Sequence, residues 1–270
     1  MRKQVSITES RPVTAAPARL GDGSVGTLAR GLDVLELFAT ASPELSQKEI
    51  SGLLGLPMPT VHRLVAVLSE RGWLDRDPGS RRLRLGLQTA RLVPALLAGM
   101  RLPELARPHL LRLATEVHET ANVAILQGPE IVYLLNETGS RLLSTRVSVG
   151  MRLPAHCTAL GKCLLAQLPD DLARVTLGAE PYERLTERTL TTWSVLAADL
   201  AAIRERGYSI SEEEYEIGLI SIAVPVHWLD GPGSAAINVS LPMARAAPQL
   251  CERLTYRLLQ AAQAIDREIG

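Results

Sequence analysis

The chain has 270 residues, 46% apolar and 21% charged, which suits one large domain or two small ones with buried cores. Basic and acidic side chains number 29 each, which argues against a uniformly basic nucleic-acid-binding surface but leaves room for a local basic patch. Aromatic residues make up 3%, too few for the stacking platforms that bind single strands, and three cysteines without CxxC spacing do not form a disulfide framework.

The first 23 residues are predicted to be a flexible leader, because residues 10–26 are rich in Pro, Ala, Gly and Ser. The sequence shows no apolar run long enough for a signal peptide or a membrane span, since Pro94 interrupts the longest one, residues 92–98. We therefore expect a cytoplasmic protein with no membrane partner.

A first organised block covers about residues 27–87. Leu28, Leu32, Leu35 and Phe38 recur at helical spacing and predict an amphipathic first helix. Ser46 and Glu49 then have the spacing of a capping box, which predicts the start of a second, short helix.

A tight turn is predicted after this short helix. Gly55 permits the turn, and Pro57 and Pro59 favour the start of a third helix, which runs to Arg71. Its outward face carries Thr60, His62 and Arg63, short or basic residues that suit a DNA major groove and its phosphates.

Two runs with period two, residues 73–76 and 82–85, follow on either side of the turn sequence 77–80. Three helices followed by an arginine-bearing hairpin predict a winged helix-turn-helix. Residues 60–87 hold six arginines and three acidic residues, so the predicted DNA side is basic. The alternative is a three-helix domain that contacts proteins, with its arginines on an ordinary solvated surface.

Residues 88–101 are predicted to form a linker helix that Pro94 can kink. Its apolar stripe, Leu92, Leu96 and Leu97, pairs either with a second subunit or with the rest of the chain. The two alternatives stay open at this point.

The second block, residues 102–270, mixes helices and strands. Helices are predicted over 103–119, 158–168, a short segment after 171, 192–206 and the amphipathic C-terminal end. Strands are predicted over 122–127, 131–135, 141–146, 208–211, 221–226 and 235–240, with a turn at 230–233. This order predicts an antiparallel sheet flanked by helices, an α+β ligand-sensing domain.

Residues 155–163 are the most chemically suggestive segment. The backbone amides of Ala159, Leu160 and Gly161 lie at a predicted helix start, where they can bind a carboxylate. Cys157 is a rival candidate as a nucleophile, but its neighbour His156 points to the opposite side if the segment is extended. A zinc site with Cys163 matches no familiar spacing, and a buried thiol is the plainest interpretation of that residue.

Several ordered motifs resemble the IclR family of bacterial transcriptional regulators. The similarity extends over about residues 24–260. The motifs lie at residues 28–35, 56–64, 73–74, 85–87, 149–150, 153–156, 158–162, 189–191, 203–204, 207–208, 213–214, 218 and 222–226.

The resemblance implies a repressor or activator of two domains, an N-terminal all-α winged helix-turn-helix domain (24–87) and a C-terminal α+β GAF-like effector-binding domain (102–270) joined by the linker helix (88–101). It implies a homodimer or homotetramer, double-stranded operator DNA as partner, a small and often acidic effector, and no catalytic residue, metal or cofactor. The DNA-contacting residues would be Ser46, Gln47, Met58, Pro59, Thr60, His62, Arg63, Arg76, Arg81, Arg82 and Arg84. The effector-binding residues would be Leu142, Cys157, Ala159, Leu160, Ser211, Ser221, Asn238 and Ser240.

This sequence departs from the family pattern at four positions, two in the DNA-binding domain and two in the effector-binding domain. Pro59 stands where the family usually has serine, and Leu83 replaces a frequent tyrosine of the wing. Ser211 and Asn238 differ from the residues of glyoxylate or pyruvate sensors, so no effector is named. The alternatives to a regulator are a hydrolase or acyltransferase that uses Cys157, and a sensor or scaffold that does not bind DNA.

Overall fold

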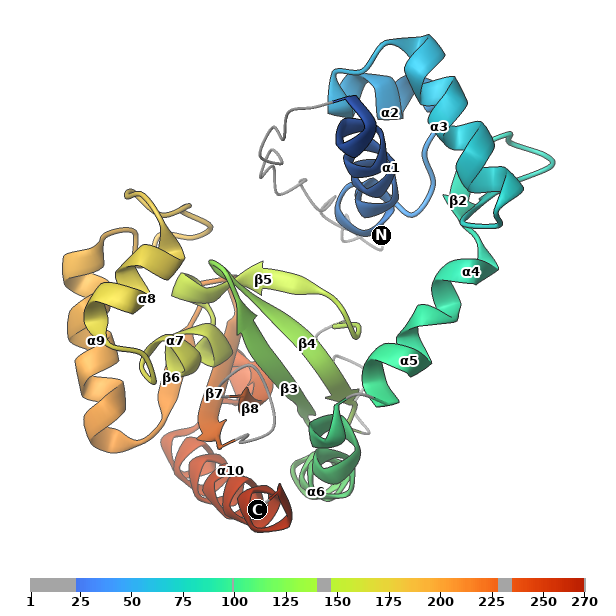
Figure 1. Cartoon of the computed structure of the whole chain (residues 1–270). Helices are drawn as coiled ribbons and strands as arrows, with labels where there is room; N and C mark the ends of the chain where they lie inside the picture. Colours follow the sequence, from blue (N-terminus) through green and yellow to red (C-terminus); the bar gives the residue numbers. More distant parts are fainter. Residues whose placement is uncertain (1–22, 99, 140–146, 228–234, 270) are drawn as a thin grey trace, which may run out of the picture. The chain divides into compact units, whose positions relative to one another are not determined.

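The computed structural model describes residues 23–98, 100–139, 147–227 and 235–269, which Figure 1 traces by colour. Contacts within the chain divide it into two compact units, residues 1–98 and 99–270. Each unit has its own buried hydrophobic core, so each is described by itself.

Three helices followed by a hairpin form the first unit. The elements are α1 (Gly23–Thr40), α2 (Gln47–Leu54), α3 (Met58–Glu70), β1 (Leu74–Arg76) and β2 (Leu83–Leu85). The predicted capping box is present, because the Ser46 amide donates to the Glu49 carboxylate (2.7 Å) and the Glu49 amide to the Ser46 hydroxyl (3.2 Å). Gly55 has φ +63°, a conformation that glycine adopts without strain, and it turns the chain from α2 toward α3. The predicted helices and hairpin are therefore confirmed.

The core of the first unit takes side chains from all three helices and both strands. Leu83 is fully buried in it, and its backbone exchanges two hydrogen bonds with Leu45 (2.8 and 3.0 Å). This bridge ties the second strand of the wing to the segment before α2. The buried members of the cluster are Val34, Phe38, Leu45, Ile50, Val61, Leu64, Val65, Leu74 and Leu83.

The predicted single linker helix is wrong in detail. Two short helices, α4 (Leu87–Ala90) and α5 (Leu92–Ala98), meet at Arg91, and the break is not at Pro94. Pro94 is the third residue of α5, a position that tolerates proline because the first helical amides have no partner within the helix. The next helix, α6 (Arg101–Val117), begins two residues earlier than predicted.

A six-stranded antiparallel sheet organises the second unit, with strand order β5-β4-β3-β8-β7-β6. Its strands are β3 (Thr120–Gln127), β4 (Glu130–Glu137), β5 (Arg152–Pro154), β6 (Ser209–Glu212), β7 (Leu219–Val226) and β8 (Ala235–Pro242). Besides α6, its helices are the 3-10 turns η1 (Ala155–Cys157) and η2 (Met243–Arg245), and α7 (Ala159–Leu165), α8 (Asp170–Leu177), α9 (Trp193–Arg206) and α10 (Pro248–Ile269). The predicted α+β class is confirmed.

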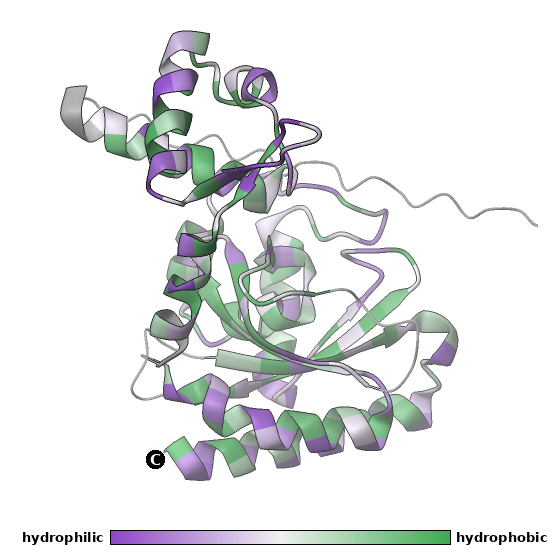
Figure 2. Ribbon diagram, turned by 90° about the vertical axis from the view of Figure 1, so that its right-hand side faces the viewer, coloured by the Kyte–Doolittle hydropathy of each residue, from purple (hydrophilic) through white to green (hydrophobic). Residues whose placement is uncertain are grey.

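The sheet has two different faces, which Figure 1 shows between α6 and α10 on one side and α7 on the other. Alternate residues of the strands, such as Val123, Ile222 and Val239, pack with α6 and α10 into one hydrophobic cluster. In Figure 2 these strands are mostly green, and α10 alternates green with purple, as expected for an amphipathic covering helix. The other face packs against α7 through small residues such as Ala124, Ala223 and Ala236.

Sequence reasoning did not predict three short elements, β5, η1 and η2, because each spans three residues. The predicted strand over 141–146, which includes Leu142, and the predicted turn at 230–233 lie outside the described residues. Within the described ranges, no single helix is long and apolar enough to cross a membrane, and the pair α2 and α3, which passes that test only together, is bent by 118°.

Candidate nucleic-acid interface and ligand site

Helix α3 presents the predicted reading face to solvent. Met58, Pro59, His62 and Arg63 are exposed, while Val61, Leu64 and Val65 anchor the opposite side in the core. Thr60 is half-buried, and its amide donates to the Pro57 carbonyl (2.9 Å). Because Pro59 has no N–H and the Thr60 amide already has an acceptor, the helix start offers few amides to a phosphate, so side chains have to supply most of that contact.

The wing is a short hairpin with an ordered tip. The Asp77 carboxylate accepts hydrogen bonds from the amides of Gly79 (3.1 Å) and Ser80 (2.7 Å) and from the Ser80 hydroxyl (2.9 Å), which lowers the pKa of Asp77. This turn confirms the predicted loop at 77–80. The predicted phosphate contacts Arg76, Arg81 and Arg84 extend from the wing and are exposed.

Two of the predicted DNA contacts have roles inside the fold. The Arg82 guanidinium donates to the Glu49 carboxylate (2.9 Å) and to the Glu44 carbonyl (2.9 Å), which joins the wing to α2. Hydrogen bonds from Ser46, together with Arg82, lower the pKa of Glu49 to about 2. Ser46 caps α2, and its neighbour Gln47 is half-buried. Leu83, which stands where the family often has a tyrosine in the wing, is buried in the core of the unit.

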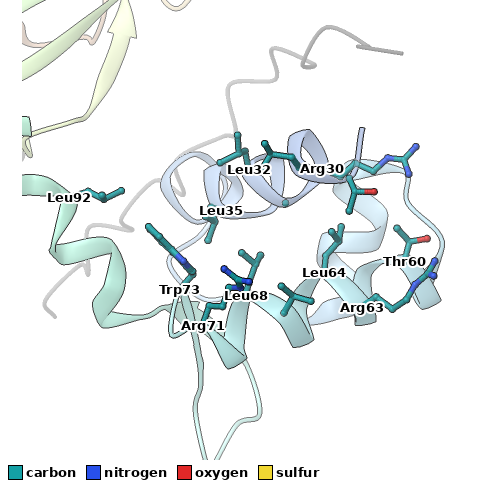
Figure 3. Close-up of a pocket in the computed structure, with 14 residues that line it drawn as sticks. Arg30, Leu32, Leu35, Thr60, Arg63, Leu64, Leu68, Arg71, Trp73 and Leu92 are labelled. Carbon is teal, nitrogen blue, oxygen red and sulfur yellow. The ribbon is translucent and has the colours of Figure 1, made fainter. Parts of the chain in front are cut away.

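A groove of about 800 Å³ lies between α1 and α3, and sequence reasoning missed it. In Figure 3, Arg30, Thr60 and Arg63 gather at one end of the groove, and Trp73 and Leu92 lie at the other. Leucines of the two helices line the middle. Arg30 is exposed and was not predicted to touch DNA, although it shares this end of the groove with two predicted contacts.

The second unit gathers most of the predicted ligand residues on the α7 face of the sheet. Ser211 pairs with Ser221, and Ser221 pairs with Ser240, in the strand register. Asn238 lies two residues before Ser240 on the same face, and its amide donates to the Ser240 hydroxyl (3.0 Å). All four of these side chains are more than nine-tenths buried.

Two asparagines that sequence reasoning missed extend this polar face. Asn122 donates to Asn238 (2.8 Å), and Asn136 donates to Asn122 (2.6 Å), across β4, β3 and β8. Asparagine is depleted in strands, so its presence within residues 120–127 was the available signal.

The chain just before α7 is held by the edge strand β6. The Ser211 hydroxyl donates to the Cys157 carbonyl (2.9 Å) and the Ser209 hydroxyl to the Ala159 carbonyl (2.6 Å). The Gly161 amide donates to the Thr158 hydroxyl (3.1 Å), so of the three predicted anion-binding amides those of Ala159 and Leu160 are left. Gly161 is required there because a Cβ would lie 2.2 Å from the Ala155 carbonyl oxygen.

The thiol of Cys157 is a poor nucleophile. It is fully buried, and this burial raises its pKa, so the reactive thiolate is disfavoured at neutral pH. Residues 155–157 form the 3-10 turn η1 and not the extended segment that was predicted. His156 Nε2 bonds to the Glu183 carbonyl (2.9 Å), and its ring lies against Tyr182, so the imidazole is occupied away from the thiol.

The described part of the chain holds no group of three His, Cys, Asp or Glu side chains placed to bind a metal. Cys163 is buried, and burial raises its pKa to about 12, as expected for a small core residue.

Comparisons with known proteins find a matching family model for each of the two units. The family model described as "IclR helix-turn-helix domain" matches residues 27–78, and the one described as "Bacterial transcriptional regulator IclR C-terminal" matches residues 95–267. The Pca regulon regulatory protein of Pseudomonas putida is 34% identical over 96% of this chain and 91% of its own length.

Two solved structures share the fold over nearly their whole length. An IclR homolog from Microbacterium hydrocarbonoxydans, crystallised with 4-hydroxybenzoate, is 28% identical with a TM-score of 0.77, covering 90% of this chain and 98% of its own. An IclR family transcriptional regulator from Brucella abortus is 27% identical with a TM-score of 0.74, covering 94% and 97%.

Proposed function

The chain belongs to the IclR family of bacterial transcriptional regulators and is an effector-controlled DNA-binding regulator, and we propose that its effector is a small organic acid. Members of this family are transcriptional regulators and not enzymes. The observation that carries the proposal is the buried polar face formed by Ser221, Asn238 and Ser240 beside the start of α7. These side chains hydrogen-bond one another, so a ligand that enters this face has to replace those hydrogen bonds with its own, which suits a polar ligand.

The carboxylate of the acid is assigned to the amides of Ala159 and Leu160, whose helix start favours negative charge. The related protein crystallised with 4-hydroxybenzoate supports an acid of this size as the first compound to test. Cys157 and Ser211 act in this proposal by holding the backbone before α7, as their mutual hydrogen bond indicates.

The DNA-contacting residues are proposed to divide into two groups. Thr60, His62 and Arg63 read base edges and the flanking phosphate from α3 in the major groove, and Arg76, Arg81 and Arg84 contact phosphates from the wing. Arg82 is a weaker candidate because its guanidinium already has two partners. Because the protein binds DNA and its cysteines are free thiols, we propose that it works in the reducing cytoplasm.

Fluorescence anisotropy tests the proposed function. The full chain is titrated at one salt concentration against a duplex from the intergenic region beside its own gene and against a shuffled duplex of equal length. Tighter binding to the intergenic duplex, altered by 4-hydroxybenzoate, supports the proposal. Equal weak binding to both duplexes contradicts the assigned operator, and an unaltered complex contradicts this acid as the effector.

We further propose that a second copy of the chain covers the groove between α1 and α3. A helix-turn-helix protein that reads two half-sites needs two recognition helices, and each chain has one. Leu28 and Leu32 on α1 are 68% and 52% exposed, and Leu92 on α5 is 56% exposed. Such a leucine-rich surface on a small unit is typical of an interface, and its apolar part lies away from Thr60, at the end that is proposed to face DNA.

Replacing both Leu28 and Leu32 with glutamate is expected to reduce the number of copies in the particle, because two charges would lie in the apolar contact. Sedimentation velocity of the full chain measures this as a change from dimer to monomer, or from tetramer to dimer. Val175→Glu, at a residue 76% exposed on α8, is the control. An unchanged sedimentation coefficient for the double variant would assign the contact to another surface.

The same arrangement gives a mechanism. An effector that binds one subunit arrangement more tightly shifts the population toward it, which changes the separation of the two recognition helices and hence operator affinity.

A further inference from the structure

A row of four hydroxyl side chains crosses the polar face of the sheet. In the strand register Ser211 pairs with Ser221, Ser221 with Ser240, and Ser240 with Thr120. The row therefore runs over the adjacent strands β6, β7, β8 and β3. Thr120 was not among the residues that the sequence indicated, and it lies at the end of the row farthest from Ser211.

Three members of the row have hydrogen-bond partners. The Ser211 hydroxyl donates to the Cys157 carbonyl (2.9 Å), and the hydroxyls of Ser221 and Ser240 bond to each other (2.7 Å). Ser240 also accepts from the Asn238 amide (3.0 Å), so one proton of the Ser221–Ser240 pair has no acceptor in this network.

Thr120 differs from the other three. Its side-chain oxygen is buried without a hydrogen-bond partner among the described residues, and the residue is 1% exposed. Thr120 shares its face with Asn122, because the intervening Ala121 packs into the cluster on the opposite side of the sheet. Its hydroxyl is thus directed to the same polar face as the proposed effector site.

We propose that Thr120 is a specificity-determining residue that hydrogen-bonds a neutral hydroxyl group of the effector, an inference that rests on the proposed effector site. A buried hydroxyl without a partner costs stability, and a ligand that supplies the partner recovers that cost on binding.

A neutral hydroxyl fits this end of the row better than a second carboxylate. In the part of the chain that the structure describes, the buried cation Lys162 is already paired with Asp199 and Glu214, and Arg245, next to the strand of Thr120 through its pair with Glu119, is also taken. A buried carboxylate needs a cationic or multiply donating partner, whereas a hydroxyl needs one donor and one acceptor. The effector is therefore a hydroxy acid, with its hydroxyl and carboxyl groups at separate positions.

The first test uses the protein without ligand. Thr120→Val removes a hydroxyl that has no partner, so the melting temperature of the full chain is expected to stay the same or to rise. Thr189→Val is the matched control, because the Thr189 hydroxyl donates to the Glu214 carbonyl (2.7 Å) and accepts from two amides, and its loss is expected to lower the melting temperature by about 3 °C. A decrease in Thr120→Val as large as that of the control would show that the Thr120 hydroxyl has a structural partner, which overturns the proposal.

The second test compares two probes, 4-hydroxybenzoate and benzoate, by isothermal titration calorimetry. The wild-type chain is expected to bind the hydroxylated acid about tenfold more tightly, the value of one additional buried hydrogen bond. Thr120→Val is expected to abolish this preference while keeping the affinity for benzoate, and Thr120→Ser to retain it.

A preference that survives in Thr120→Val assigns the hydroxyl contact to another residue and overturns the proposal, as does a wild-type chain that binds both acids equally or neither. The proposed regulator function is judged separately, because Thr120→Val is expected to bind the intergenic duplex as the wild type does. Loss of that sequence-dependent binding in the wild type would contradict the function, whatever the two acids do.

Discussion

Arg63→Ala is expected to weaken binding to the specific operator about 10- to 100-fold and to leave the melting temperature unchanged. Arg63 is exposed on α3, and Leu64 and Val65 behind it hold the helix in the core without its help. An arginine that pairs with a base edge contributes about 1–3 kcal/mol of discrimination, whereas a phosphate contact contributes equally on every sequence. Anisotropy on the intergenic and shuffled duplexes separates these two contributions.

Two other variants make this measurement specific. Arg84→Ala, in the exposed wing, is expected to weaken binding to both duplexes by a similar factor and to reduce the salt dependence of binding, since it removes a proposed phosphate contact. Arg267→Ala, near the end of α10, is expected to change neither affinity. If Arg63→Ala loses the same affinity for both duplexes, Arg63 contacts a phosphate and not a base. If it loses no affinity for either duplex, α3 does not contact DNA through Arg63.

The first unit is predictable from sequence because its signals are local. The capping box at Ser46, the left-handed turn at Gly55 and the leucine spacing of α3 each lie within a few residues, and the structure contains all three. The groove and the Arg82–Glu49 pair join residues more than 30 positions apart, and no local pattern shows which helix faces will meet.

The ligand site shows the same limit in another form. The family resemblance named Ser221, Asn238 and Ser240, which the register brings together, but it gave no reason to choose Thr120 or Asn122. Their position depends on β3 pairing with β8, more than 100 residues later in the chain, in one register. A shift by one residue would turn both side chains to the apolar face.

Lys162→Met is expected to destabilise the second unit by about 3–5 kcal/mol, because removing the ammonium leaves the buried Glu214 carboxylate without its cation, whereas the half-buried Asp199 keeps Arg206. Lys162 is 2% exposed, and its ammonium group lies 2.5 Å from a Glu214 oxygen and 2.7 Å from an Asp199 oxygen. These contacts join α7 to α9 and to the segment between β6 and β7. The methionine side chain fills a similar volume, so the measured loss in a urea melt reports the charge and not a cavity.

The dependence of this loss on pH distinguishes the ion pair from simple packing. Burial raises the pKa of Glu214 above its ordinary value of 4.5 even though Lys162 opposes the shift, so losing the ammonium raises it further. A carboxyl whose folded pKa is raised stabilises the folded state at low pH, and this stabilisation is lost as pH rises through the folded value. We therefore expect the difference between Lys162→Met and wild type to grow from about pH 5 to pH 7 and to shrink in the double variant Lys162→Met/Glu214→Gln. Lys48→Met, at an exposed lysine of α2, is the control, and a loss independent of pH would mean that Lys162 stabilises the unit through packing alone.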